Sequence, residues 1–259
     1  MQNKKQPTKF IALATLIAVA ITIFTVISNQ GGSAFTFQGK IGKDKDEKDK
    51  IPIAVYTASL PADPQERALR LARNDRYNNR YTVPFDELPL STMGRIVASD
   101  WHVYMLALPA NESDAVVLAE VVSANAYVSN DGTGAYSEFT LRIKQVLKDD
   151  QRGTLNPDGS IVAEREGAIV QLSSGRTIRY GISGQGTPQI SRLYVFFLKY
   201  NNQGEDYQIL TGYELRKGHV SPLDEVDPFL TYKRVDEKSF LNTVNEAVSQ
   251  TQEKRRLNQ

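Results

Sequence analysis

The stretch Leu193–Tyr200, LYVFFLKY, decides the fold, because it is the most apolar run in the body of the chain. Its consecutive apolar side chains need cover on both faces, as a strand between two packed layers has. We predict that it lies between the interior of a β-barrel and a covering helix. The expected cover is the helix predicted over residues 236–250, which carries one apolar stripe. The stripe consists of Phe240, Leu241, Val244, Ala247 and Val248.

Strand patterns surround this run between residues 111 and 235. Phe139, Leu141 and Ile143 alternate with polar residues, which is the period of a half-buried strand. Turn clusters, such as Asn130–Gly134, separate the runs. The expected strands are Ala115–Val122, Glu138–Lys144, Ile161–Ala163, Ala168–Leu172, Thr177–Ile182, Leu193–Tyr200 and Tyr207–Leu215. This spacing predicts a mainly β protein in which residues 111–216 close into a small antiparallel barrel with flanking helices, the alternative being a sandwich of two separate sheets.

Residues 51–110 are expected to form a helical and wrapping segment instead. Asp63 and Pro64 mark a helix start, because a carboxylate N-cap is followed by proline at the first helical position. The helix should end near Arg76. Its arginines recur every third residue, and we interpret them as a solvated face in preference to a membrane-contacting one. They are Arg67, Arg70, Arg73 and Arg76.

Residues 10–28 carry the strongest membrane signal. Eighteen uncharged residues, Phe10–Ile27, would form a helix of about 27 Å, close to the ~30 Å core of a bilayer. Lysines precede this run and none follows it for twelve residues, so residues 1–9 should stay in the cytoplasm. The alternative is a secretory signal cleaved after Gly32–Ala34, although such signals usually have apolar runs of about 7–15 residues. Both the membrane anchor and the cleaved signal would place the folded domain outside the cytoplasm. If residues 10–28 are an anchor, the lipid bilayer is also a partner.

Residues 29–50 are predicted to be a charged flexible linker. Residues 43–50, KDKDEKDK, alternate lysines with acids and lack the glycine and distal glutamate of an EF-hand loop. We therefore interpret them as a solvated spacer and not as a calcium site. Residues 251–259 form a basic tail.

The composition excludes several classes of function. The 259 residues include no cysteine and two histidines, so thiol catalysis and thiolate metal sites are excluded and a histidine metal site is disfavoured. We predict no metal and no cofactor. The net charge is +1, but residues 1–9 and 251–259 carry +3 and +2, which leaves −4 for the rest. A body with this charge lacks the basic footprint of a nucleic-acid binder, so no nucleic-acid partner is expected.

Three segments carry a resemblance to a known family: SDAVVLAEVVSANAYV at 113–128, YSEFTLRIKQVLKDD at 136–150 and RLYVFFLKYNNQGEDYQILTGYE at 192–214. Their order is similar to netrin-like modules and to the N-terminal barrels of tissue inhibitors of metalloproteinases. It looks closest to uncharacterised bacterial secreted or membrane-anchored proteins of the same plan. The resemblance covers residues 111–216 and implies an OB-like barrel. The inhibitors reach the protease zinc through an N-terminal cysteine, so the resemblance does not extend to inhibition in this cysteine-free chain.

One local motif, Gly181–Gly186 (GISGQG), invites a functional interpretation. It departs from the nucleophile elbow at Gln185, lies between two strand patterns and lacks the lysine of a P-loop. We interpret it as a glycine-rich connection. As a ligand loop it would place Arg179, Tyr180 and Gln185 beside backbone N–H donors. His219, in a predicted turn, completes the candidate partner-binding residues, and no catalytic residue is predicted.

These patterns predict a non-enzymatic cell-envelope module that binds a protein or glycan partner through the barrel face and its loops. The alternative is an extracytoplasmic hydrolase that uses a carboxylate pair, for example Glu164 with Glu166 or Asp224 with Glu225. Two buried carboxylates that face each other across a cleft would favour this alternative.

Overall fold

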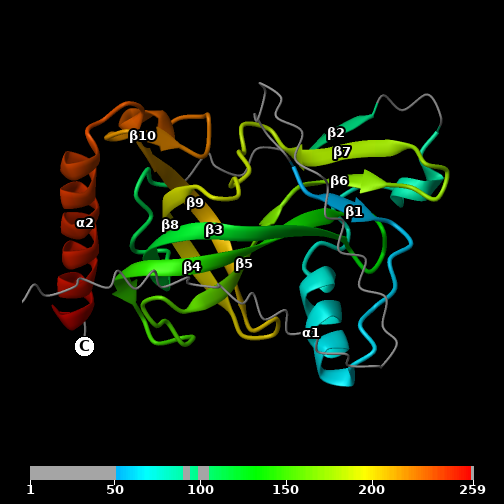
Figure 1. The fold of residues 1–259 in the computed structure, drawn as a ribbon, viewed down its shortest axis with the longest axis horizontal. Helices are drawn as coiled ribbons and strands as arrows, with labels where there is room; N and C mark the ends of the chain where they lie inside the picture. The colour runs from blue at the N-terminus through cyan, green and yellow to red at the C-terminus, as the bar shows by residue number, and fades with distance from the viewer. Residues whose placement is uncertain (1–50, 90–93, 99–104, 258–259) are drawn as a thin grey trace, which may run out of the picture. The chain divides into compact units, whose positions relative to one another are not determined.

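The computed structural model describes residues 51–89, 94–98 and 105–257. The predicted membrane segment, residues 10–28, and the linker, residues 29–50, lie outside the described residues, as does His102. The described part is mainly β, with two α-helices and two sheets (Figure 1). Neither of these helices is long and apolar enough to cross a membrane.

The elements follow one another from a short first strand to a long last helix. They are β1 Ile53–Val55, α1 Pro64–Asp75, β2 Arg95–Ala98, β3 Ala115–Val128, β4 Ala135–Asp149, β5 Ser160–Glu166, β6 Ala168–Gln171, β7 Thr177–Ile182, β8 Leu193–Asn201, β9 Asp206–Arg216, β10 His219–Pro222 and α2 Glu237–Leu257. Short 3-10 helices lie at Phe85–Glu87 and Phe229–Tyr232. The seven predicted strands are confirmed as β3 to β9. Three strands, β1, β2 and β10, are not anticipated by the sequence, because runs of three or four residues carry no readable period.

The larger sheet has six strands in the order β10-β9-β5-β4-β3-β8, and β8 also pairs with β9. The pairings therefore return from β8 to β9. Neighbouring strands are antiparallel except β5 and β9, which are parallel and joined through two register pairs, Ala163 with Tyr207 and Glu164 with Gln208. The β3–β4 ladder, by contrast, extends from Ala115 to Val128. The ring of pairings is thus closed unevenly.

The second sheet has the order β1-β6-β7-β2. Here the prediction that residues 168–182 belong to the barrel is wrong, because β6 and β7 pair with strands from the segment predicted to wrap. The local pattern of β6 and β7 specifies strands but not their partners. The inner face of this sheet packs into its own apolar cluster, which includes Phe85, Ile96, Val170, Ile178 and Tyr180.

β8 occupies the central position that its sequence predicts. Tyr194, Phe196 and Leu198 enter one core cluster, whereas Val195 and Phe197 enter a second cluster on the other face. α2 covers that second face with three buried residues of the predicted stripe, which are Phe240, Val244 and Val248. In Figure 1 this helix and the second sheet lie at opposite ends of the larger sheet.

α2 begins as predicted and ends later. The Asp236 carboxylate accepts a hydrogen bond from the Ser239 backbone N–H at 3.0 Å, which satisfies a free donor of the first turn. The helix continues to Leu257, so residues 251–257 of the predicted basic tail belong to it.

The packing of α2 predicts a large cost for truncating Phe240. The ring is fully buried and lies 4.8 Å from the Tyr213 ring, so Phe240→Ala should lower the free energy of unfolding by about 3–5 kcal/mol. Asn242→Ala, an exposed change on the same helix, is the matched control and should stay within about 0.5 kcal/mol of the parent. Urea unfolding measures both. Equal midpoints and slopes for Phe240→Ala and the parent would contradict the packing.

Candidate functional site

α1 presents a row of arginines to the larger sheet. Its start is the predicted one, because the Asp63 carboxylate accepts the Glu66 backbone N–H at 2.8 Å. The interpretation of the arginines as a solvated face holds for Arg67, which is exposed, but is wrong for the other three. The side chains of Arg70, Arg73 and Arg76 are 13%, 12% and 21% exposed. The three-residue spacing places them on one side of the helix, and that side faces buried acids.

Those acids are Glu138 on β4, Glu164 on β5 and Asp206 at the start of β9. They are 7%, 0% and 1% exposed, and one carboxylate oxygen from each lies within 4.8 Å of those from the other two. Glu138 and Glu164 are register partners on adjacent strands. Like charges in that position repel each other, so the sheet needs neutralising cations at this point.

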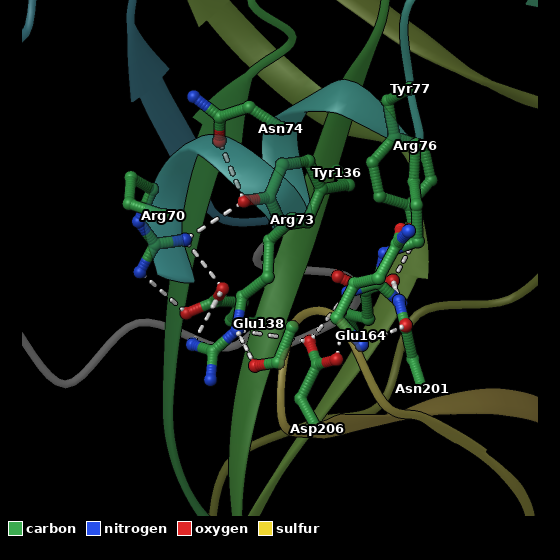
Figure 2. Close-up of polar contacts among 12 residues, drawn as sticks. Arg70, Arg73, Asn74, Arg76, Tyr77, Tyr136, Glu138, Glu164, Asn201 and Asp206 are labelled. Atoms are coloured by element: carbon green, nitrogen blue, oxygen red, sulfur yellow. Dashed lines mark hydrogen bonds and ion pairs between the residues drawn. The ribbon is translucent and has the colours of Figure 1, made fainter. Parts of the chain in front are cut away.

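The arginines supply the neutralising charge in sequence order (Figure 2). Arg70 binds Glu138 with two hydrogen bonds of 2.5 and 2.9 Å. Arg73 bridges Glu138, at 3.3 Å, and Asp206, at 3.2 Å. Arg76 bridges Glu164, at 2.5 Å, and Asp206, at 2.7 Å. We call these six residues the arginine–carboxylate cluster.

Two stacked tyrosines close one side of the cluster. The Tyr77 and Tyr136 rings lie 4.4 Å apart at an interplanar angle of 14°. The Tyr77 hydroxyl donates to Glu164 at 2.8 Å, and the Tyr136 hydroxyl donates to the Asn74 side-chain oxygen at 2.8 Å while it accepts from Arg70. Burial raises the pKa of Tyr77 well above its ordinary value, and the charge of Glu164 adds to this effect. Tyr77 is therefore a neutral donor throughout the physiological range.

Glu164 and Asp206 are neighbouring buried acids, and both have a raised pKa. Burial raises the pKa of Glu164 well above its ordinary value, the charge of Asp206 raises it further, and Arg76 opposes both effects. Burial also raises the pKa of Asp206, but the charges of Arg76 and Arg73 both lower it. Of the two acids, Glu164 is therefore the one whose neutral form the surroundings favour more strongly.

The three carboxylates have the spacing that a cation could use, but the surrounding charges disfavour one. Carboxylate oxygens are suitable ligands for Ca²⁺ or Mg²⁺. In this cluster three guanidinium groups already bind them, so a metal ion would have to displace an arginine or accept its repulsion. We conclude that the arginine–carboxylate cluster fixes α1 to the sheet.

The raised pKa of Glu164 predicts a pH-dependent stability. The folded state holds this proton more tightly than the unfolded chain, so its contribution is full below the ordinary pKa near 4.5 and is lost as the pH rises through the raised value. Glu164→Gln should remove up to about 1.4 kcal/mol per pH unit of this decline, because the amide stays neutral. Glu246→Gln, an exposed change on α2, should leave the pH profile unchanged. Urea unfolding across pH measures all three proteins, and parallel profiles for the parent and Glu164→Gln would contradict the raised pKa of Glu164.

A cavity of about 480 Å³ lies elsewhere, between parts of both sheets. Strands β2 and β7 of the smaller sheet line it together with β9, β10 and the connection from β7 to β8. Its lining includes four arginines and three glutamates: Arg95, Arg179, Arg192, Arg216, Glu166, Glu214 and Glu225.

The glycine-rich segment Gly181–Gly186 forms one wall of this cavity. A side chain at Gly184 would lie 2.2 Å from Val226, and one at Gly186 would lie 1.9 Å from the Leu223 carbonyl oxygen. These two glycines are therefore required by the close approach of residues 223–226. The Gly186 N–H donates to Asp224 at 3.3 Å, so that donor is used within the wall.

Three of the four predicted partner-binding residues line the cavity, and they differ in whether their side chains are already bound within the protein. Tyr180 is buried and donates to the Glu166 carboxylate, and Gln185 donates to the Glu166 carbonyl oxygen, so both are engaged in the wall. Arg179 is exposed and has no side-chain partner among the described residues. His219 is exposed at the first position of β10 and does not line the cavity.

Two further arginines of the cavity lining resemble Arg179 in being exposed and without a side-chain partner among the described residues. Sequence analysis does not single them out. Arg95 is the register partner of Arg179 on the parallel strand β2, so both side chains lie on the same face of the smaller sheet. Arg216, at the end of β9, is also exposed. Neither has an ion pair or a side-chain hydrogen bond within the part of the chain that the structure describes. Arg192 differs, since it lies 3.7 Å from Glu214.

A second buried ion pair stabilises the wall. Arg165 on β5 binds the Asp224 carboxylate, which also accepts the Thr211 hydroxyl at 2.7 Å. Asp224 is fully buried, and its neighbours Leu223 and Glu225 line the cavity. The chain segment on this side of the cavity is thus fixed to the larger sheet.

Neither of the two carboxylate pairs proposed for hydrolysis has both of its members in the lining of this cavity. Glu164 lies in the arginine–carboxylate cluster and Asp224 in the second ion pair, whereas Glu166 and Glu225 line the cavity. Hydrolysis by two carboxylates requires both groups to face the substrate. Within the described residues, each proposed pair is therefore divided between a buried ion pair and the cavity.

Comparison with known proteins adds no identification. The chain matches no protein-family model and no curated protein.

Proposed function

We propose that the protein is a non-enzymatic binding module of the cell envelope. Residues 10–28 anchor it in the bilayer with residues 1–9 in the cytoplasm, and the β domain lies in the periplasm or outside the cell. The larger sheet is proposed to be an OB-like barrel. Its support is the cycle of pairings β9-β5-β4-β3-β8 that returns to β9.

We place the binding site of this module in the 480 Å³ cavity. The observation that carries this proposal is the set of three arginines, Arg95, Arg179 and Arg216, which line it without partners among the described side chains. An arginine guanidinium presents a fork of N–H donors that matches a carboxylate or a phosphate. The partner, an envelope protein or glycan, is therefore expected to offer anionic groups.

The positions of the charged side chains favour binding over hydrolysis. The acid with the raised pKa, Glu164, is sealed beneath α1. A general acid must reach the bond that it protonates. The cavity instead offers exposed cations, which suit recognition of an anion.

The membrane topology has its own test. With residues 1–9 in the cytoplasm, protease added to intact spheroplasts should digest the β domain, and a tag at the N-terminus should survive. Lysed spheroplasts are the control in which both are digested. Full protection of the β domain in intact spheroplasts would contradict the topology. A mature protein that starts near residue 35 and washes off membranes would support the cleaved signal instead.

Site-specific photo-crosslinking tests the cavity. A photoreactive residue in place of Ser221, which is exposed and lines the cavity, should form an adduct with the partner in intact cells. The same residue in place of Ser174, an exposed turn position outside the lining, is the matched control and should form none. Arg179→Glu should abolish the Ser221 adduct, whereas Arg152→Glu, an equal charge change outside the lining, should preserve it. Equal adducts from both positions, or an adduct indifferent to Arg179→Glu, would contradict the site.

A further inference from the structure

We propose that the ligand of this cavity is an acidic peptide in extended conformation, which adds as a strand to the free side of β2. This inference rests on the proposed function, because it names the partner chemistry of the same cavity. It is carried by the position of β2, by its hydrogen-bonding pattern and by the side chains on its two faces.

β2 is an edge strand of the smaller sheet. In the order β1-β6-β7-β2 it pairs with β7 on one side, and none of the described strands pairs with it on the other. Arg95, Ile96 and Val97 of this strand line the cavity. An unpaired strand edge is a template for a further strand, and its backbone groups give affinity without requiring a particular sequence.

The register identifies which backbone groups are free. The Arg179 N–H donates to the Gly94 carbonyl oxygen at 2.8 Å, and Arg179 is the register partner of Arg95. In a parallel ladder this pattern directs the N–H and C=O of Ile96 toward β7. The N–H and C=O groups of Arg95 and Val97 therefore point to the opposite side, where an added strand would lie.

The two faces of β2 specify the side chains of the added strand. Ile96 is buried and belongs to the apolar cluster of this sheet, so the added strand should continue that face with apolar residues. The opposite face carries the exposed Arg95, beside Arg179 on β7. Acidic residues on this face would bind these arginines. An alternation of acidic and apolar residues satisfies both faces, because side chains in a strand alternate.

The side chains that line the cavity favour a peptide over a glycan and over a second copy of this chain. The two tyrosines that line the cavity, Tyr180 and Tyr194, are each about 1% exposed, so neither offers the open ring on which a sugar would stack. A second copy paired edge to edge would bring two sets of Arg95 and Arg179 together. Like charges along neighbouring strands are destabilising.

The probe is a fluorescein-labelled peptide of nine residues that alternates glutamate and valine, with glutamate at both ends. Fluorescence anisotropy with the full chain in a zwitterionic detergent should show saturable binding. The double variant Arg95→Glu/Arg179→Glu should weaken it by about tenfold or more, and Arg152→Glu should leave it unchanged. Val97→Pro should also weaken it, since proline removes a donor from the open side and is tolerated at such edge positions.

Two altered peptides separate strand addition from simple charge attraction. The same peptide with N-methyl groups on alternate amides, in both possible phases, keeps its charges, and at least one phase should lose binding. A peptide with lysine in place of glutamate should not bind. Undiminished binding of both N-methylated peptides, or of the parent peptide to Val97→Pro, would overturn strand addition.

The remaining outcomes are equally decisive. Tighter binding of polyglucuronate than of the peptide would overturn the peptide in favour of an anionic glycan. A dimer that Val97→Pro dissociates, with no peptide bound, would overturn it in favour of a second copy. If no peptide binds while the Ser221 adduct still depends on Arg179, the acidic strand is refuted and the proposed binding site stands. If that adduct is also absent, the proposed function itself fails.

Discussion

The three carboxylates of β4, β5 and β9 can be buried because α1 places three guanidinium groups against them. An isolated charge inside a protein is costly, and two register-paired glutamates are costlier still. The contacts of Arg70, Arg73 and Arg76 therefore determine more than the docking of one helix. They make it possible for three strands of the larger sheet to carry acids inward at one place. Removal of Arg76 would leave Glu164 without its arginine, and removal of Arg70 or Arg73 would leave Glu138 with one arginine in place of two, whereas a surface pair would contribute little.

β5 connects this cluster to the cavity, because its last residues carry charges to three different places. Glu164 enters the arginine–carboxylate cluster, Arg165 points to the other face and binds Asp224, and Glu166 accepts the Tyr180 hydroxyl at the cavity wall. Successive side chains of a strand point to opposite faces, so a short sequence can serve separate layers. The wall of the cavity is thus held by the same strand that anchors α1. The free arginines contrast with this wall, since their partners are absent from the described side chains.

The sequence allowed most elements to be predicted, but few of their partners. Hydrophobic periodicity identified β3 to β9, and the two faces of Leu193–Tyr200 correctly required the cover of α2. The second sheet was missed because pairing between β1 and β6, or between β2 and β7, is a long-range choice that local pattern does not record. Of the candidate site, Arg179 was identified from its place beside the glycine-rich segment. Arg95 was missed, since its relation to Arg179 exists in the register of two distant strands and not in the sequence.

The arginine–carboxylate cluster shows why buried charge escapes sequence analysis even when its signal is present. Arg67, Arg70, Arg73 and Arg76 recur every third residue, which on a helix corresponds to a rise of about 4.5 Å per step. Adjacent strands lie about 4.8 Å apart. A row of arginines with this rise can span acids on neighbouring strands, and each of the last three contacts one or two carboxylates. The periodicity of the helix was therefore visible. The acids that pair with these arginines could not be identified from the sequence, because they belong to strands separated from α1, and from one another, by dozens of residues.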